Sequence, residues 1–326
     1  MTEVPLLEVM NLEVEFRQRR RNVKALDNLS FAIRKGEILG IVGESGAGKS
    51  LTGAAIMGLI EPPGRISGGT VSFQGQRIDI TPEKVRGSDI GMIFQDPLTS
   101  LNPVKTVAEH LVETIQFHFS LSVTQAHLRA GELLEKVGIL PERIHAYPHQ
   151  FSGGMRQRIV IALALAAEPS LIIADEPTTA LDVSIQHQIL QLLSGICRAD
   201  KAAMILITHD MGVVSELTDR VAVMYAGRLV ELGPTSEVIS NPRHPYTKGL
   251  MKATPSIDDV RRDLDLPQIP GQMPGLEHAL KGCKFHPRCT EALDICAAHV
   301  PDFIGNVACH LTHAEYRKQT AEGRPE

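Results

Sequence analysis

The stretch Gly43-Glu44-Ser45-Gly46-Ala47-Gly48-Lys49-Ser50 decides the fold of this 326-residue chain. It fits the pattern G-x-x-x-x-G-K-[ST], in which glycines let successive backbone N–H groups surround an anion at a helix N-terminus. Lys49 can then reach the outer phosphates of a nucleotide such as ATP, and the Ser50 hydroxyl can bind Mg²⁺. The apolar run Ile38–Val42 precedes the pattern and a helix-like stretch, Lys49–Leu59, follows it. We therefore expect a strand, a phosphate-binding loop and a helix, in that order.

Further apolar runs of strand length occur along the chain. They are continuous rather than alternating, as a sheet that is covered on both faces requires. Helix-like stretches such as Val183–Cys197 lie between them. The runs are Ile90–Phe94, Leu171–Ala174, Met204–Ile207 and Val221–Met224. The pattern predicts an α/β fold with a mostly parallel sheet and helices on both faces.

Two other regions have a different pattern. Three segments alternate apolar and polar residues, which is typical of half-solvated antiparallel strands. They are Leu6–Phe16, Leu29–Ile33 and Thr70–Ile78. Residues 99–150 contain no strand pattern but two helix-like stretches, Val107–Phe117 and Thr124–Val137. We expect an antiparallel β subdomain beside the core and a helical subdomain inserted into it.

The chain changes character again after Gly233. Prolines are frequent there, at positions 234, 242, 245, 255, 267, 270 and 274, and long apolar runs are few. Proline-rich sequence of this kind favours loops. We therefore expect a nucleotide-binding domain over residues 1–233 and a small, loop-rich C-terminal extension over residues 234–326.

The composition excludes several classes of protein. The chain has 33 basic and 38 acidic side chains, a net charge of −5, which argues against a general nucleic-acid binder. The longest apolar run, Ile159–Ala167, is far shorter than the ~20 residues that cross a bilayer. The N-terminus has no basic region followed by an apolar one, so we expect no export and a reducing, cytosolic environment.

Two adjacent carboxylates follow the apolar run at Leu171. Asp175 and Glu176 come at the carboxyl end of the expected strand, where a parallel sheet places its ligands. Beside a phosphate-binding loop, one carboxylate can hold Mg²⁺ and the other can orient and deprotonate water. We expect Asp175 to be the metal ligand and Glu176 the general base.

A second motif distinguishes one family among nucleotide-binding proteins. It is the run Phe151-Ser152-Gly153-Gly154-Met155-Arg156-Gln157-Arg158. Together with the phosphate loop it resembles the ATPase subunits of ATP-binding-cassette (ABC) transporters, whose signature is Ser-Gly-Gly followed by Met or Gln. In that family the signature binds the γ-phosphate of an ATP that lies in the phosphate loop of the opposite subunit. The resemblance implies a head-to-tail dimer. Phe151 departs from the leucine that is common at this position, and both residues are apolar anchors.

Other positions match the family in the same order along the chain. Gln95 matches the glutamine that senses the metal and the attacking water, and so adds a third Mg²⁺ ligand to Ser50 and Asp175. Asp182, in Ala180-Leu181-Asp182, matches the loop that crosses the dimer interface. The resemblance also implies that His209 contacts the γ-phosphate and that Phe16 stacks on adenine. A core phenylalanine is the alternative for Phe16.

Three segments narrow the resemblance to the dipeptide, oligopeptide and nickel importers. They are residues 94–103 (FQDPLTSLNP), 174–183 (ADEPTTALDV) and 241–247 (NPRHPYT). This branch implies peptide import, with nickel or another small solute as the alternative. It also implies two membrane-spanning permeases, an identical or related second ATPase, an extracytoplasmic peptide-binding protein and a peripheral place on the cytoplasmic face of the inner membrane. A soluble ABC ATPase that transports nothing is the less favoured class.

Four of the five cysteines fall in the last 44 residues: Cys283, Cys289, Cys296 and Cys309. Their spacing lacks the C-x-x-C of most zinc ribbons, and a reducing compartment disfavours disulfides. Four thiols in a small extension with little core of its own indicate a metal centre. The importer resemblance implies a [4Fe–4S] cluster, with zinc or unligated thiols as alternatives. Cys197, on an expected helix, is interpreted as a packing residue.

Overall fold

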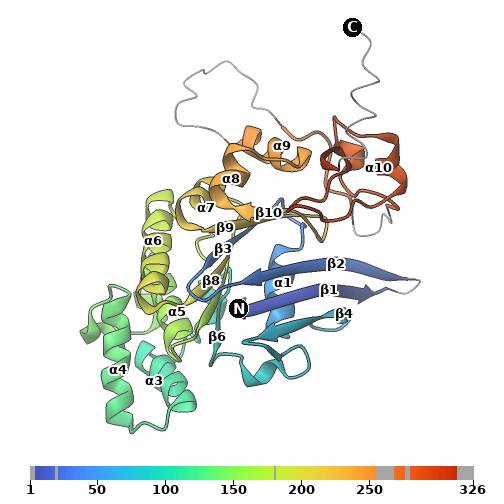
Figure 1. Cartoon of the computed structure of the whole chain (residues 1–326). Coiled ribbons are helices and arrows are strands. Elements are labelled where there is room, and N and C mark those ends of the chain that lie inside the picture. The colour runs from blue at the N-terminus through green and yellow to red at the C-terminus, as the bar shows by residue number, and fades with distance from the viewer. Residues whose placement is uncertain (1–3, 19–20, 180, 255–267, 276–279, 314–326) are drawn as a thin grey trace.

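The computed structural model describes residues 4–18, 21–179, 181–254, 268–275 and 280–313. Ala180, named above with the interface loop, lies outside these ranges, as do several parts of the expected C-terminal extension. Two β-sheets, helices on their faces and a loop-rich C-terminal part make up the described chain (Figure 1). Within these ranges, no helix combines the length and the apolar character needed to cross a bilayer.

The larger sheet has six strands and carries the phosphate loop. In spatial order they are β10 (Arg228–Pro234), β9 (Arg220–Tyr225), β3 (Ile38–Val42), β8 (Ala203–Ile207), β7 (Leu171–Asp175) and β6 (Ile90–Ile93). The five strands from β9 to β6 run parallel, as the sequence predicts, because their continuous apolar residues are buried on both faces. The remaining strand, β10, lies at the other edge of the sheet and runs antiparallel to β9. The sequence analysis did not predict it.

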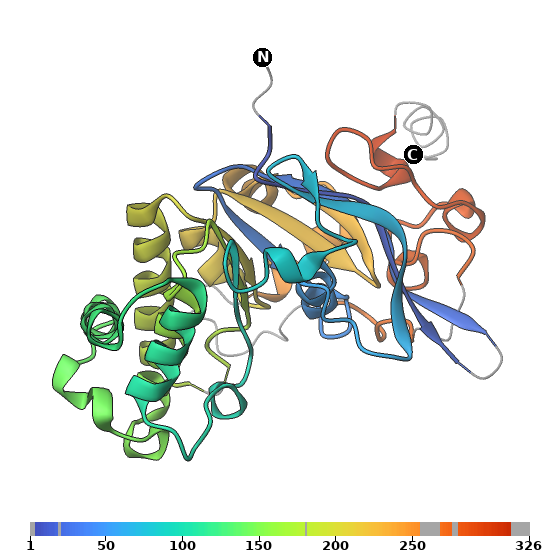
Figure 2. The same ribbon diagram turned by 90° about the horizontal axis from the view of Figure 1, so that it is seen from below.

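Helices and the second sheet cover the two faces of this sheet. Alternate residues of each strand belong to opposite apolar clusters: Ile172 packs with α5 (Gly153–Leu165) and α6 (Val183–Asp200), whereas Ile173 packs with α1 (Lys49–Ile56) and the second sheet. Figure 2 shows this layering from below. The remaining core helix is α7 (Met211–Leu217). The prediction of helices on both faces is confirmed.

The smaller sheet is antiparallel, as expected. Its strands, in spatial order, are β2 (Asn22–Ile33), β1 (Leu7–Arg17), β4 (Gly64–Phe73) and β5 (Gln76–Arg77), and the short helix η1 (Pro82–Lys84) follows. The prediction of one strand over Thr70–Ile78 is wrong. Gln74 and Gly75 both have positive φ and turn the chain between β4 and β5, which pair through Phe73 and Gln76.

The inserted region is helical, as predicted. Its helices are α2 (Pro97–Ser100), α3 (Val107–His118), α4 (Val123–Lys136), η2 (Pro141–His145) and η3 (Pro148–Gln150). Capping boxes fix where α3 and α4 begin: Thr106 exchanges hydrogen bonds with Glu109, and Ser122 with Gln125. Apolar faces of both helices pack on α5, which joins the insertion to the sheet.

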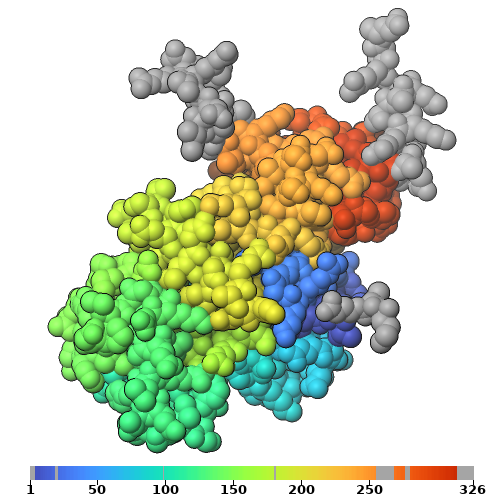
Figure 3. All heavy atoms as spheres, turned by 60° about the vertical axis from the view of Figure 1, so that its left-hand side comes forward, coloured from blue at the N-terminus to red at the C-terminus, as the bar shows by residue number. Residues whose placement is uncertain are grey.

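The C-terminal part consists of short elements joined by loops. They are α8 (Thr235–Ser240), α9 (Pro245–Ala253), η4 (His286–Arg288), α10 (Asp294–Ala298) and η5 (His310–Thr312). A backbone bridge pairs Glu231 of β10 with Val307, and Ala308 donates to the Val230 carbonyl at 2.9 Å. Figure 3 shows this part, in orange and red, packed on the rest of the molecule.

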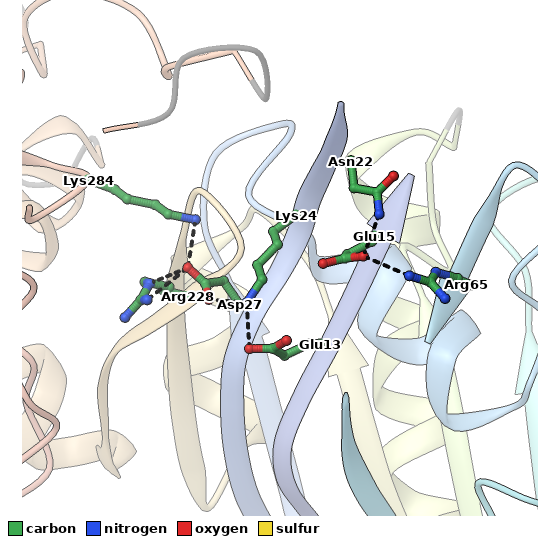
Figure 4. A network of polar contacts seen from close by, with 8 residues as sticks. All are labelled: Glu13, Glu15, Asn22, Lys24, Asp27, Arg65, Arg228 and Lys284. Carbon is green, nitrogen blue, oxygen red and sulfur yellow. Dashed lines mark hydrogen bonds and ion pairs between the residues drawn. The ribbon is translucent and has the colours of Figure 1, made fainter. Parts of the chain in front are cut away.

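A carboxylate on β2 also connects the smaller sheet to the C-terminal part of the chain. Asp27 Oδ2 lies 2.8 Å from Arg228 on β10 and 3.4 Å from Lys284, and Asp27 Oδ1 lies 3.8 Å from Lys24 (Figure 4). Burial raises the pKa of Asp27, but the charges of Arg228 and Lys284 outweigh it and leave the pKa below its ordinary value. Asp27 therefore stays ionised and holds Lys284, next to Cys283, against the core.

Candidate nucleotide site

The phosphate loop connects β3 to α1, as the sequence predicts. Gly43 has φ +154°, and a Cβ there would lie 2.3 Å from the Met224 carbonyl oxygen. Gly48 has φ +98° and is the N-cap of α1. At the same loop, the N–H of Gly227 donates to the Ala47 carbonyl at 2.8 Å. Glycine is thus required at both ends of the loop, because a side chain at either position would strain the backbone or meet its neighbour.

Lys49 is buried against the loop that it follows. Its Nζ donates to the carbonyl oxygens of Gly43, at 2.9 Å, and of Glu44, at 3.1 Å. Burial lowers the pKa of Lys49, while the charges of Glu176 and Asp175 act in the opposite direction. The ammonium group therefore lies at the loop, within the field of Asp175, which ends β7, and of Glu176.

A cleft of about 490 Å³ lies over the loop. It is lined by Phe16, Ala25, Ser45, Gly46, Gly48, Lys49, Ser50, Leu51, Gln95, Glu176 and His209. The structure thus brings Phe16 from β1 together with the loop, with Gln95 after β6, and with Glu176 and His209 after β7 and β8. Ala25 and Leu51, which the sequence analysis did not single out, complete the apolar part of the wall.

Ser50 and Asp175 meet beside this cleft although 125 positions separate them. The Ser50 hydroxyl donates to Asp175 Oδ1 at 2.8 Å. Burial raises the pKa of Asp175, the bond from Ser50 lowers it, and the charge of Glu176 raises it, with a net increase. A hydroxyl and a carboxylate are oxygen donors of the kind that Mg²⁺ prefers. The pair therefore fits the predicted magnesium site, to which Gln95 would add an amide oxygen.

Glu176 is the centre of a polar cluster at the carboxyl edge of the sheet. Its Oε2 accepts from Gln95 Nε2 at 3.3 Å and from Thr179 Oγ1 at 3.0 Å, and its Oε1 lies 3.6 Å from His209 Nδ1. The backbone φ of Glu176 is +43°, a left-handed conformation that a glutamate rarely adopts, and its N–H donates to the Ile207 carbonyl. The Glu176 carboxylate therefore lies between Gln95 and His209, which the sequence analysis assigned to ATP hydrolysis together with it.

Thr179 is a residue of this site that the sequence analysis missed. Its spacing of three residues from Glu176, within Glu176-Pro177-Thr178-Thr179, was the available signal. A hydroxyl three positions after a carboxylate can return to it through a tight turn, and the Thr179 N–H donates to the Glu176 carbonyl at 3.2 Å. The threonine thus fixes the direction of the Glu176 side chain.

The signature residues do not line the cleft of their own chain. Ser152 is the N-cap of α5, where its Oγ accepts from the Met155 N–H at 3.4 Å. The two glycines pack against the segment that leads into α6: a Cβ at Gly153 would lie 3.3 Å from Leu181, and one at Gly154 would lie 2.7 Å from Ile185. Asp182 is the N-cap of α6 and makes no side-chain capping bond.

The four C-terminal cysteines are free and lie near one another. Burial, with smaller effects from neighbouring thiols, raises the pKa of Cys289 to about 11 and that of Cys309 to about 12. Among the described residues, however, no group of three or more potential ligands is spaced to hold a metal ion. The predicted [4Fe–4S] or zinc centre is therefore not supported by the described residues. Cys197 is fully buried on α6, in accord with packing.

The fold and the cleft define a phosphate-loop nucleotide-binding protein. Residues 26–179 match a family model described as "ABC transporter", and residues 230–296 match one described as "Oligopeptide/dipeptide transporter, C-terminal region". The solved dimeric structure of the ATP-binding cassette MJ0796 bound to ADP and Pi superposes with a TM-score of 0.63 at 28% identity, covering 70% of this chain and 98% of that one.

Two curated relatives match almost end to end. The oligopeptide transport ATP-binding protein AppD of Bacillus subtilis is 42% identical, over 97% of this chain and 99% of its own. The oligopeptide transport ATP-binding protein OppD of Salmonella typhimurium is 48% identical, over 89% of this chain and 88% of its own. The chain belongs to the ATP-binding proteins of ABC transporters.

Proposed function

We propose that this chain is the ATP-hydrolysing subunit of an importer that takes up dipeptides and oligopeptides. The observation that carries the ATPase is the cleft, which brings the phosphate loop, Gln95, Glu176 and His209 to one edge of the sheet. The peptide specificity is supported by the match of residues 230–296 and by the names of the relatives. Import of nickel or another small solute is the alternative within the same family.

In the mechanism that we propose, the residues of the cleft position ATP and water. The N–H groups of the loop and Lys49 bind the phosphates, and Phe16 stacks on the base. Ser50, Asp175 and Gln95 would hold Mg²⁺, which would supply positive charge to neutralise the phosphates. Glu176 accepts the proton of the attacking water, and His209, 3.6 Å from it, contacts the γ-phosphate.

The second half of each site would come from another subunit. Ser152, Gly153 and Gly154 lie outside the cleft of their own chain, and Val183, which follows Asp182 at the start of α6, is 84% exposed. The exposed signature serine and the exposed Val183 support a head-to-tail dimer in which the signature covers the neighbour's ATP. The second subunit is either an identical chain or a related ATPase.

We further propose two membrane-spanning permeases and an extracytoplasmic peptide-binding protein as partners. The helical insertion carries large exposed apolar residues, which is the composition that a docking surface for permease helices requires. They are Val104, Phe117, Val123, Leu128 and Leu140. The chain would then lie on the cytoplasmic face of the inner membrane as a peripheral protein, with residues 1–233 as the ATPase domain and 234–326 as the extension.

Peptide uptake by cells tests the importer. In cells from which the gene has been deleted, we expect the wild-type chain, but not Lys49→Ala, to restore uptake of a labelled tripeptide, because Lys49 is needed to bind ATP. Lys248→Met, a surface change remote from the cleft, should restore uptake fully and serves as the control. Unimpaired peptide uptake in the deletion strain, with loss of nickel uptake, would favour the alternative substrate.

The four cysteines remain a candidate metal site in our proposal. Cys283, Cys289, Cys296 and Cys309 lie close enough for the charge of one thiolate to raise the pKa of another, an arrangement that a bound cation would relieve. A [4Fe–4S] cluster is favoured by the importer family, and zinc is the alternative; either would add stability to a loop-rich extension. Anaerobic purification followed by iron, sulfide and zinc analysis distinguishes a [4Fe–4S] cluster from zinc. A purified chain that contains neither metal refutes the site.

A further inference from the structure

The outer side of the phosphate loop is held by the C-terminal extension. The backbone N–H of Glu44, the second residue of the loop, donates to the Tyr246 hydroxyl at 2.9 Å. Both carboxylate oxygens of Glu44 lie 3.1 Å from one guanidinium nitrogen of Arg288. Tyr246 and Arg288 are 202 and 244 positions further along the chain. A loop that is defined by a local motif therefore depends on contacts that are remote in the sequence.

Arg288 is built into the structure and is not a mobile surface cation. Only 6% of its side chain is exposed. Its Nε donates to the Pro270 carbonyl at 2.7 Å, and its guanidinium also contacts the Ile269 carbonyl and the Tyr225 hydroxyl, both at 3.4 Å. These bonds orient the planar group before it reaches Glu44, so the ion pair loses little further side-chain entropy. Such a pair is stronger than one between exposed side chains.

An aromatic cluster fixes the hydroxyl that receives the Glu44 N–H. The ring centroids of Tyr246 and Tyr225 are 4.7 Å apart, and those of Tyr246 and Phe285 are 5.4 Å apart. Tyr246 begins α9 next to Pro245, and its own N–H donates to His244 Nδ1 at 3.0 Å. The tyrosine is fully buried, so its ring has one available position.

The charge of Glu44 gives these contacts a consequence for nucleotide binding. A carboxylate in a phosphate loop repels the anion that the loop must bind, and at about 10 Å in a partly buried site this repulsion corresponds to roughly a tenfold weaker affinity. Arg288 neutralises that carboxylate. From the other side, Lys49 Nζ and the Ala47 N–H each donate to the Glu44 carbonyl at 3.1 Å, so the residue is held on both sides.

We propose that Arg288 and Tyr246 are positioning residues for ATP binding, through which the C-terminal extension sets the shape and the charge of the phosphate loop. Neither residue lines the nucleotide cleft. Arg288 neutralises Glu44, and Tyr246 fixes the direction of the Glu44 peptide unit. The inference rests on the proposed binding of ATP at this loop.

Equilibrium binding of MgATP to the full-length chain tests the proposal, with a fluorescent ATP analogue as the probe and ATP as the competitor. We expect Arg288→Met to raise the Kd and the KM for ATP about tenfold, with kcat at saturating ATP within about twofold of wild type. Arg288→Lys should restore part of the affinity, because it keeps the charge but not the planar fork. Lys248→Met removes an exposed ion pair with Glu291 in the same extension and should leave the Kd unchanged.

The double variant Glu44→Gln/Arg288→Met separates charge from folding. Because the repelling carboxylate is gone, we expect it to bind ATP more tightly than Arg288→Met alone. No recovery, or a Kd for Arg288→Met equal to that of Lys248→Met, would overturn the role of Arg288. Should Arg288→Met not fold, Tyr246→Phe is the second variant: we expect a roughly threefold higher Kd, and an unchanged Kd refutes positioning by the extension. A wild-type chain that binds no MgATP would instead refute the nucleotide site itself.

Discussion

The nucleotide cleft and the C-terminal extension are built in opposite ways. The cleft is made of loops that follow neighbouring strands, and the sheet order brings Ser50 and Asp175 within 2.8 Å. The extension consists of short helices and turns, and it is anchored by buried polar groups such as Glu231, Arg288 and His244. The difference teaches that changes to side chains of the cleft act on the chemistry, whereas changes to the buried polar groups Glu231 and His244 act on stability.

The largest effect expected from this contrast is on turnover. Because we propose Glu176 as the general base, Glu176→Gln should retain MgATP, favour the closed dimer and lower the rate of phosphate release about 10²- to 10⁴-fold. Glu168→Gln is a matched control, since Glu168 also has a positive φ but lies outside the cleft. Steady-state phosphate release is the measurement, and undiminished release by Glu176→Gln would mean that another group is the base.

A carboxylate of β10 that anchors the extension should show the reverse behaviour. Glu231 is 2% exposed and accepts the backbone N–H groups of Arg243, at 2.8 Å, and His244, at 3.0 Å. Glu231→Ala leaves the buried N–H of His244 and the part-buried N–H of Arg243 without their acceptor, so we expect the free energy of unfolding to fall by about 3 kcal/mol. Urea denaturation measures it. The exposed Glu237 on α8 of the extension is the control, and equal stability of the Glu231→Ala and Glu237→Ala variants would contradict the contrast.

The extension should also give the protein a dependence on pH. Burial, with a smaller effect from Lys248, lowers the pKa of His244 to about 3, against about 6.5 in an unfolded chain. Between these values the unfolded state binds a proton that the native state does not, so stability falls as the pH drops below 6.5. The loss should reach about 2 kcal/mol between pH 6.5 and pH 5.

His244→Asn separates this titration from capping, because asparagine still offers an oxygen to the Tyr246 N–H but does not ionise. Urea unfolding at pH 7 and pH 5 should show a smaller loss for the variant than for the wild-type chain. An identical loss in both proteins would assign the acid sensitivity to other groups.

The sequence could predict the parts of the molecule whose signals are local. The phosphate loop, the five parallel strands and the capping of α3 and α4 follow from residues that are adjacent or a few positions apart. Much of the cleft could also be anticipated, because parallel strands bring their carboxyl ends to one edge.

What the sequence could not predict depends on partners that are distant in the chain. The antiparallel strand β10 follows the two-residue turn Ala226-Gly227, whose positive φ values are not evident from an alanine. Arg288 gave no local sign of its contact with Glu44, 244 positions away. The four cysteines were interpreted from their count and spacing, but burial, which raises the pKa of Cys283, Cys289 and Cys309, is decided by tertiary packing.

Because the backbone of Glu176 is left-handed, selection for stability and selection for ATP hydrolysis favour different residues at this position. Asparagine and glycine adopt such a conformation with less strain, so either substitution at position 176 should raise the free energy of unfolding. Neither could take a proton from water. A screen for thermal stability alone would therefore enrich inactive variants with asparagine or glycine at this position. The glutamate is retained only where the cell requires ATP hydrolysis.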